Sequence, residues 1–400
     1  AQPVCSASRA ALLTGCYPNR IGIHGALSPK VTYGLSTEET TLAELLRSRG
    51  YQTSMVGKWH LGHHRQFLPT RHGFDEYFGL PYSNDMWPFH AEYPDSYPDL
   101  MLYDYDKPVE VLTDQSDLTM ELTRKSISFI EKNKNTPFFL YLAHPQPHVP
   151  LFASSKFKGR SDHGLYTDVI EEIDYSLGQI METLKKNNLD KNTIVVFTSD
   201  NGPWLSYGDH AGSTGIYREG KGTTWEGGQR VPCLVWYPSE IKPSTVISTP
   251  FMGIDWLPTF AKLTNSKLSE NKIDGKNIWK NLTGKTEANP HEALFFYYHK
   301  NSLHGVRYGD YKMYFPHRYR TLNGRTGRDD GSPIKYEYVN LIENELYNLK
   351  TDPSETINII NENPELAKKI IALADIKRKE IGDDLTNVIG LENREVGMID

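Results

Sequence analysis

The first two thirds of the chain alternate between two spacings of apolar residues. Apolar residues at helical spacing between charged residues predict three helices, over 40–49, 117–132 and 166–186. Short apolar and β-branched runs predict three strands, over 51–56, 138–142 and 193–198, and we expect the last two to be buried. Because strands and helices alternate, we expect an α/β fold with a large, mostly parallel sheet covered by helices on both faces.

The pattern changes near residue 290. Short apolar runs joined by turns predict four further strands, over 294–298, 303–308, 311–315 and 346–349. A helix over 364–381 follows them. We therefore expect two domains, an α/β domain over 1–289 and a smaller domain with an antiparallel sheet and a helix over 290–400.

The composition is that of an ordinary globular protein. The 44 Lys and Arg residues and 50 Asp and Glu residues give a net charge of −6 without a basic cluster, so no nucleic-acid partner is expected. No apolar run approaches the roughly 20 residues that a membrane span needs. The three cysteines make no disulfide framework, and if Cys5 is modified, only Cys16 and Cys233 are left to pair.

Cys5 lies in an unusual local sequence. Small residues follow it, then Arg9, and then the run Ala10-Ala11-Leu12-Leu13, which favours a helix. A nucleophile at the start of a helix is stabilised by the positive end of the helix dipole. The alternative is that Cys5 is a small buried apolar residue, as free cysteines commonly are.

Four more polar clusters follow predicted strands or a glycine-rich stretch. They contain Lys58 and His60, His144 and His148, Asp200 and Asn201, and Lys221. Ligands of open α/β sheets collect at the carboxyl ends of the strands. Lysine supplies a point charge for an anion, histidine transfers protons near neutral pH, and Asp and Asn oxygens suit calcium or magnesium. Taken singly, each cluster also fits a surface turn or a loose loop.

In this order, the Cys5 segment and the four clusters resemble the type I, formylglycine-dependent sulfatases of the alkaline phosphatase superfamily. The C-terminal segment Glu345-Leu346-Tyr347-Asn348-Leu349, before Asp352-Pro353, resembles that of the arylsulfatase A-like members and of bacterial enzymes that act on sulfated glycans. Ala7 stands where the commonest form of the cysteine motif has proline. The resemblance implies that a formylglycine-generating enzyme oxidises Cys5 to formylglycine, whose hydrate attacks the sulfur of a sulfate ester.

The resemblance also implies roles for the other residues. Arg9, Lys58 and Lys221 would hold sulfate oxygens, His148 would protonate the leaving oxygen, and His60 would act as a base. Asp200 and Asn201 would supply half of a calcium site, with magnesium as the alternative ion. His144 has no counterpart in the family, so we expect it to be a hydrogen-bonded structural residue.

In the family, a stretch before the cysteine holds the first strand, two metal-binding aspartates and commonly an export signal. We expect such a stretch to precede Ala1 in the whole protein. The expected location is accordingly periplasmic or secreted.

The expected substrate is a sulfated carbohydrate or an aryl sulfate. Candidate substrate contacts are Asp85 and Trp87, in a segment rich in aromatic residues, and His304, Arg307 and His317 in the second domain. Two alternatives stay open: a phosphate or phosphonate ester hydrolase of the same fold, and a non-catalytic protein that binds sulfated glycans.

Overall fold

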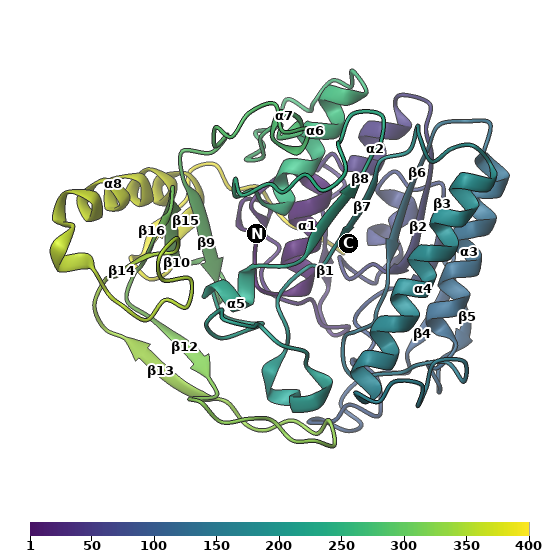
Figure 1. Cartoon of the computed structure of the whole chain (residues 1–400), viewed down its shortest axis with the longest axis horizontal. Coiled ribbons are helices and arrows are strands. Elements are labelled where there is room, and N and C mark those ends of the chain that lie inside the picture. Colours follow the sequence, from purple (N-terminus) through teal and green to yellow (C-terminus); the bar gives the residue numbers. More distant parts are fainter. Residues whose placement is uncertain (400) are drawn as a thin grey trace.

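The computed structural model describes residues 1–399 and contains two principal sheets. A five-stranded sheet lies in the first third of the chain, and a four-stranded antiparallel sheet lies in the last third, at the opposite side of the molecule (Figure 1). Helices pack around both sheets. This arrangement confirms the predicted α/β class with a separate antiparallel sheet.

The five-stranded sheet is built around β2 (Gln52–Lys58). β2 pairs in parallel with β3 (Glu76–Leu80) and with β6 (Phe138–Ala143). On the far side of β3, the strands β4 (Met101–Asp104) and β5 (Lys107–Val111) are antiparallel. The sheet is therefore mixed, and its parallel part brings the carboxyl ends of β2, β3 and β6 to one edge, where ligands collect in such sheets.

Two groups of helices pack around this sheet. The first group contains α3 (Leu118–Asn133) and α4 (Leu165–Lys186), which lie side by side, with α3 against β2 and β6 (Figure 1). The second group contains α1 (Cys5–Thr14), α2 (Leu42–Arg47) and α6 (Trp256–Leu263), which contact one another. The predicted helix over 40–49 is shorter in the structure because Thr41 and Glu44 form a capping box at its start.

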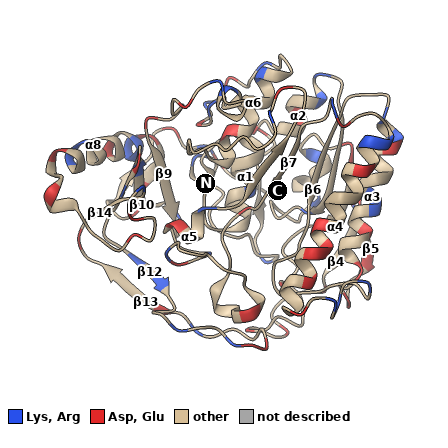
Figure 2. Ribbon diagram, in the orientation of Figure 1, with Lys and Arg blue, Asp and Glu red and all other residues tan. Residues whose placement is uncertain are grey.

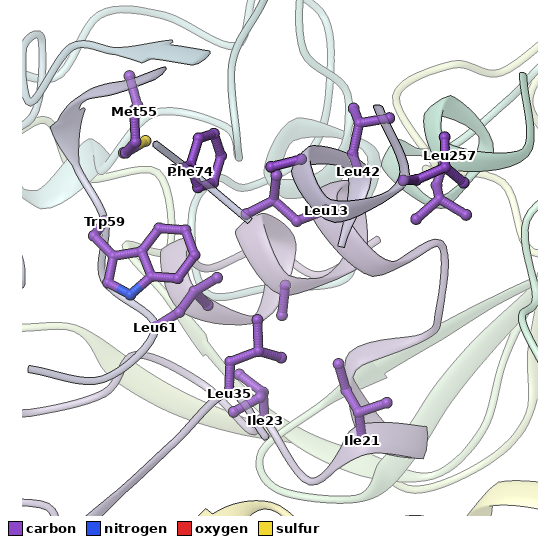
Figure 3. Close-up of a cluster of buried hydrophobic side chains, with 14 of the residues drawn as sticks. Leu13, Ile21, Ile23, Leu35, Leu42, Met55, Trp59, Leu61, Phe74 and Leu257 are labelled. Atoms are coloured by element: carbon purple, nitrogen blue, oxygen red, sulfur yellow. The ribbon is translucent and has the colours of Figure 1, made fainter. Parts of the chain in front are cut away.

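Helix α1 lies at the centre of the molecule. Leu13 of α1 packs in a buried cluster with Leu42, Met55, Phe74 and Leu257 (Figure 3). On its other side, Ala11 joins a second buried cluster, which is formed by the C-terminal sheet and α8 (Pro364–Ile381). Small side chains allow this close packing on both sides, so the start of α1 is a fixed point of the fold.

The C-terminal sheet has the strand order β14-β11-β10-β9, and every neighbouring pair is antiparallel. Its strands are β9 (Leu294–Tyr298), β10 (Ser302–Tyr308), β11 (Tyr311–Tyr314) and β14 (Glu345–Asn348). A separate hairpin, β12 (His317–Thr321) with β13 (Glu337–Leu341), extends from this sheet along the lower edge of Figure 1. The loop of that hairpin touches the first domain. In this contact, the backbone carbonyl of Arg328 in the loop accepts a hydrogen bond from the backbone N–H of Asp209 (3.1 Å).

The remaining elements are short. Among the strands are β1 (Tyr33–Gly34) and β17 (Gly397–Met398), which pair with each other and so bring residues 397–398 back to the first domain. The others are β7 (Val195–Thr198), β8 (Cys233–Trp236), β15 (Gly382–Asp383), β16 (Val388–Ile389), α5 (Glu226–Gln229), α7 (Trp279–Leu282) and six 3₁₀ turns, at Pro18–Ile21, Arg65–Phe67, Pro69–Arg71, Leu205–His210, Gly253–Asp255 and Ile360–Glu362. Basic and acidic residues are interspersed along the ribbon of the chain (Figure 2). No helix in residues 1–399 combines the length and the apolar character that a membrane crossing requires.

Two details differ from expectation. The strand predicted over 193–198 is not a buried parallel strand, because β7 pairs antiparallel with β8 and its side chains are half-buried. The side chains of β6 are also mostly half-buried, since β6 is the outer strand of the five-stranded sheet in residues 1–399. Cys16 and Cys233 do not pair, and both are free thiols.

Candidate active site

Cys5 is the first residue of α1 and is only 2% exposed. Backbone and side-chain contacts fix this start of the helix. Ala7 N donates to Gly25 O (3.1 Å), and Ser6 Oγ accepts a hydrogen bond from Leu27 N (2.9 Å). The side chain at position 5 therefore has a defined place at the positive end of a helix dipole.

Lys58 ends β2 and is buried. Its Nζ donates to Ser83 Oγ (2.9 Å), and its carbonyl accepts from Arg9 Nη1 (2.6 Å). Gly57 precedes it with φ 109°, where an added Cβ would collide with the carbonyl of Ala143 on the neighbouring strand. The glycine of the predicted motif thus permits close strand pairing, and the pairing holds Lys58 at the sheet edge.

His60 has a defined tautomer. Its Nε2 donates to Leu27 O (2.8 Å), so Nδ1 carries a lone pair. This buried Nδ1 finds no hydrogen-bond partner by geometry in residues 1–399, and the imidazole lies within interaction distance of Cys5. Burial lowers the pKa of His60, the contact with Cys5 opposes this shift, and Lys58 reinforces it. His60 is therefore a neutral proton acceptor facing position 5.

His148 and Lys221 form a close pair on the other side of the site. Lys221 Nζ lies 2.6 Å from His148 Nε2, and His148 Nδ1 donates to Val149 O (2.7 Å). Asp85 Oδ1 is 4.0 Å from the same Nδ1. Lys221 belongs to a segment that is bonded to the start of α1, because Gly222 N donates to Pro3 O (2.9 Å).

The combined effect of these groups appears in the pKa of Cys5. Burial by itself raises the pKa of the thiol, but the ammonium groups of Lys221 and Lys58 lower it more. The nearby imidazoles of His148 and His60 act in the same direction, and the pKa lies well below its ordinary value. The site therefore stabilises negative charge at position 5.

Asp200 and Asn201 follow β7 and lie beside this group. Arg9 Nε donates to Asp200 Oδ2 (3.1 Å), which connects the pair to α1. Asn201 Oδ1 is buried and accepts no hydrogen bond within residues 1–399. A carboxylate and an unpaired amide oxygen fit a hard divalent cation. Within the same residues, no group of three or more His, Cys, Asp or Glu side chains is placed to hold a metal.

The candidate substrate residues have different surroundings. Asp85 lies at the site beside His148, whereas Trp87 is buried in an apolar cluster, where its ring packs on Phe152. Trp87 therefore belongs to the core, because its side chain is buried among apolar neighbours.

The second-domain candidates also pack inside the protein. His304 stacks on His317 (centroids 3.9 Å apart), and both are buried. Arg307 bonds to the Gly309 carbonyl (3.0 Å) and approaches Glu226 (3.8 Å). These contacts join the three residues to the second domain and to Glu226. His144, expected to be structural, bonds to Ser176 Oγ on α4 (3.1 Å).

Three residues of the site were not predicted from the sequence. Ser83 accepts from Lys58, Trp204 lies under Lys221 Nζ (4.7 Å to the ring centroid), and Arg320 Nε donates to Lys221 O (3.1 Å). Trp204 closely follows Asp200 and Asn201, a position that could have drawn attention to it. Nothing in the local sequence marks Ser83 or Arg320, which reach the site only through the fold.

Comparison with known proteins agrees with this geometry. Residues 1–266 match the sulfatase family, and residues 289–390 match the C-terminal region of aryl-sulfatase. The arylsulfatase of Hemicentrotus pulcherrimus is 38% identical over 328 residues, which are 78% of this chain and 59% of that protein. Human N-acetylgalactosamine-6-sulfatase is 38% identical over 333 residues, which are 79% of this chain and 63% of that protein. The chain thus spans less than two thirds of either relative.

A solved structure is similar over nearly the whole chain. The structure of Ps i-CgsB in complex with k-i-k-neocarrahexaose has a TM-score of 0.76 and 29% identity, and the match covers 94% of this chain and 82% of that one. The family match extends over more than half of the chain, and it includes Cys5, Lys58, His148 and Lys221. This chain belongs to the sulfatase family.

Proposed function

We propose that this chain hydrolyses sulfate esters of carbohydrates or of aryl alcohols, with Cys5 converted to formylglycine. The observation that carries the proposal is the convergence of three separate segments on position 5. They bring Lys58, His60, His148 and Lys221 to the buried start of α1. This set supplies positive charge for an anionic ester, a proton acceptor and a proton donor.

Hydrated formylglycine supplies the hydroxyl that attacks sulfur. Lys58 and Lys221 neutralise the anionic oxygens, and Arg9 adds a third positive charge beside Asp200. His60, with a free lone pair on Nδ1, accepts a proton at position 5. His148 Nε2 and Lys221 Nζ, 2.6 Å apart, form the pair that supplies a proton to the leaving oxygen.

We infer that Asp200 and Asn201 hold a divalent cation, calcium in the first place and magnesium as the alternative. When bound, such an ion neutralises a sulfate oxygen and lowers the pKa of a bound hydroxyl. The unpaired Oδ1 of Asn201 supports this assignment. The hydrogen bond from Arg9 Nε orients the Asp200 carboxylate.

We further infer that a formylglycine-generating enzyme acts on the chain and that the protein is periplasmic or secreted. The family match supports both inferences. Mass spectrometry of the peptide that contains Cys5 tests the first, since an aldehyde has a lower mass than the thiol. Cell fractionation tests the second.

The function is tested with the full chain, matured by a formylglycine-generating enzyme and supplied with calcium. We expect turnover of 4-nitrophenyl sulfate and of N-acetylgalactosamine 6-sulfate. The Cys5→Ala variant should lose about a thousandfold or more in kcat/KM, because the nucleophile is absent. Lys242→Met, on the exposed surface, serves as the control.

Two results would contradict the proposal. Faster cleavage of 4-nitrophenyl phosphate than of 4-nitrophenyl sulfate would indicate a phosphate ester hydrolase of the same fold. A persisting Cys5 thiol in natively produced protein that still binds sulfated sugars would indicate a non-catalytic binding protein.

A further inference from the structure

A cavity of about 220 Å³ adjoins His148. Its lining includes Asp85 and Val149, which are the two residues that face His148 Nδ1. His148 also interacts with Cys5. His148 therefore connects two residues of the cavity lining with position 5.

The lining of this cavity is polar on one side and apolar on the other. Asp85 is 7% exposed, and its Oδ1 accepts no hydrogen bond by geometry from residues 1–399. A second carboxylate, Asp330, and the ring of His210 also face the cavity. Leu151 and Tyr207 form an apolar wall, on which the C–H groups of a ligand can pack.

The C-terminal hairpin supplies part of this lining. Asp330 lies in the turn between β12 and β13, where its Oδ1 accepts from Ser332 N (2.8 Å). Gly331 has φ 73°, and an added Cβ would collide with the ring of His210. The two domains thus close the cavity together at a point where only glycine fits.

We propose that this cavity holds a sugar ring of the substrate and that its two carboxylates select a ring without a second anionic group. This inference rests on the proposed sulfatase activity. Sugar hydroxyls donate hydrogen bonds. Asp85 Oδ1 has no partner by geometry in residues 1–399, and Asp330 bonds to Ser332 through Oδ1, which leaves its Oδ2 for a ligand. A further sulfate or carboxylate would meet like charge there.

The size of the cavity agrees with this assignment. Pockets for drug-sized ligands measure about 300–1,000 Å³. The cavity is smaller than these pockets, so it suits one ring and not several.

The test compares Asp330→Asn with Asp329→Asn, which removes the same charge from the adjacent, exposed position. Substrates are N-acetylgalactosamine 6-sulfate, N-acetylgalactosamine 4,6-disulfate and 4-nitrophenyl sulfate, with the matured full chain. We expect Asp330→Asn to lower kcat/KM for the monosulfated sugar, relative to that for 4-nitrophenyl sulfate, about tenfold. Asp330→Asn should also reduce the ratio of kcat/KM for the monosulfated sugar to kcat/KM for the disulfated sugar.

Equal behaviour of the two variants, within twofold, would overturn the inference. Gly331→Ala provides a second variant, because it narrows the cavity without changing its charge. We expect the same fall in kcat/KM for the monosulfated sugar relative to that for 4-nitrophenyl sulfate. Unchanged kinetics in Gly331→Ala would also overturn it. Thermal unfolding of each variant excludes a general loss of structure.

A binding measurement separates this inference from the proposed function. Titration calorimetry of Cys5→Ser protein with N-acetylgalactosamine 6-sulfate needs no turnover. Binding that weakens with Asp330→Asn and not with Asp329→Asn supports the cavity even if the matured chain lacks sulfatase activity. Binding that is equal in both overturns the cavity even if the chain is a sulfatase.

Discussion

At the scale of single residues, the site is defined by charge around one buried side chain. Cys5 is held among Lys58, Lys221 and two histidines, and its pKa is low although burial opposes ionisation. The same field that stabilises a thiolate stabilises the anionic oxygens of a bound ester. The thiol of the unmodified protein is therefore a reporter for the electrostatics of the site.

This reporter gives the first prediction. Lys58→Met in the unmodified chain should raise the pKa of Cys5, because the removed ammonium group favours the thiolate over the thiol. Ultraviolet absorbance of the thiolate, followed against pH, measures the shift, and Lys242→Met on the exposed surface is the control. An unchanged titration of Cys5 in Lys58→Met would show that Lys58 does not act on position 5.

The sequence identified the charged residues of this site better than its aromatic ones. Lys58, His148 and Asp200 follow strands, and strand ends are visible in a single sequence. Trp87 and His304 looked accessible because local sequence does not reveal which neighbours cover a side chain. Each is buried by residues distant in the chain, Phe152 and His317 respectively.

At the scale of elements, glycines set how closely the strands approach. Gly57 faces Ala143 on β6 and Gly79 on β3, at the end of β2 where Lys58 follows. The helices that cover this sheet were predictable from their 3.6-residue period. The half-buried state of β6 and β7 was not predictable. A continuous apolar run has the same sequence pattern whether or not neighbouring elements bury the strand.

Gly57→Ala gives the second prediction. We expect a loss of about 3 kcal/mol or more in the free energy of unfolding, since the Cβ meets the Ala143 carbonyl and φ 109° is strained for alanine. Gly178→Ala is the matched control: Gly178 lies in α4 with no atom near the added Cβ, and it should gain about 0.5–1 kcal/mol. Chemical denaturation of both variants measures the difference, and similar stabilities would refute the role given to Gly57.

At the scale of the whole molecule, the second domain completes the site of the first. Lys312 of β11 is buried and donates to Thr224 O (2.7 Å) and Glu226 Oε1 (2.8 Å), shortly after Lys221 in the chain. Arg320 of β12 bonds to Lys221 O. The predicted change of pattern near residue 290 agrees with a sheet that begins at Leu294. The contacts between the two domains were not predictable, because they join residues about 90 positions apart and local sequence does not indicate them.

Lys312→Met tests whether the C-terminal sheet holds the Lys221 segment in place. Removing this ammonium group leaves the buried Glu226 carboxylate with weaker partners, and loss of one partner of a buried pair costs about 3–5 kcal/mol. We expect lower stability and lower kcat/KM for 4-nitrophenyl sulfate, whereas Lys350→Met, at an exposed position, should change neither. Adding Glu226→Gln to Lys312→Met should restore much of the stability, because the unpaired charge is gone. If kcat/KM recovers with the stability, the network acts only through folding; if it stays low, Lys312 also positions Lys221 for the reaction.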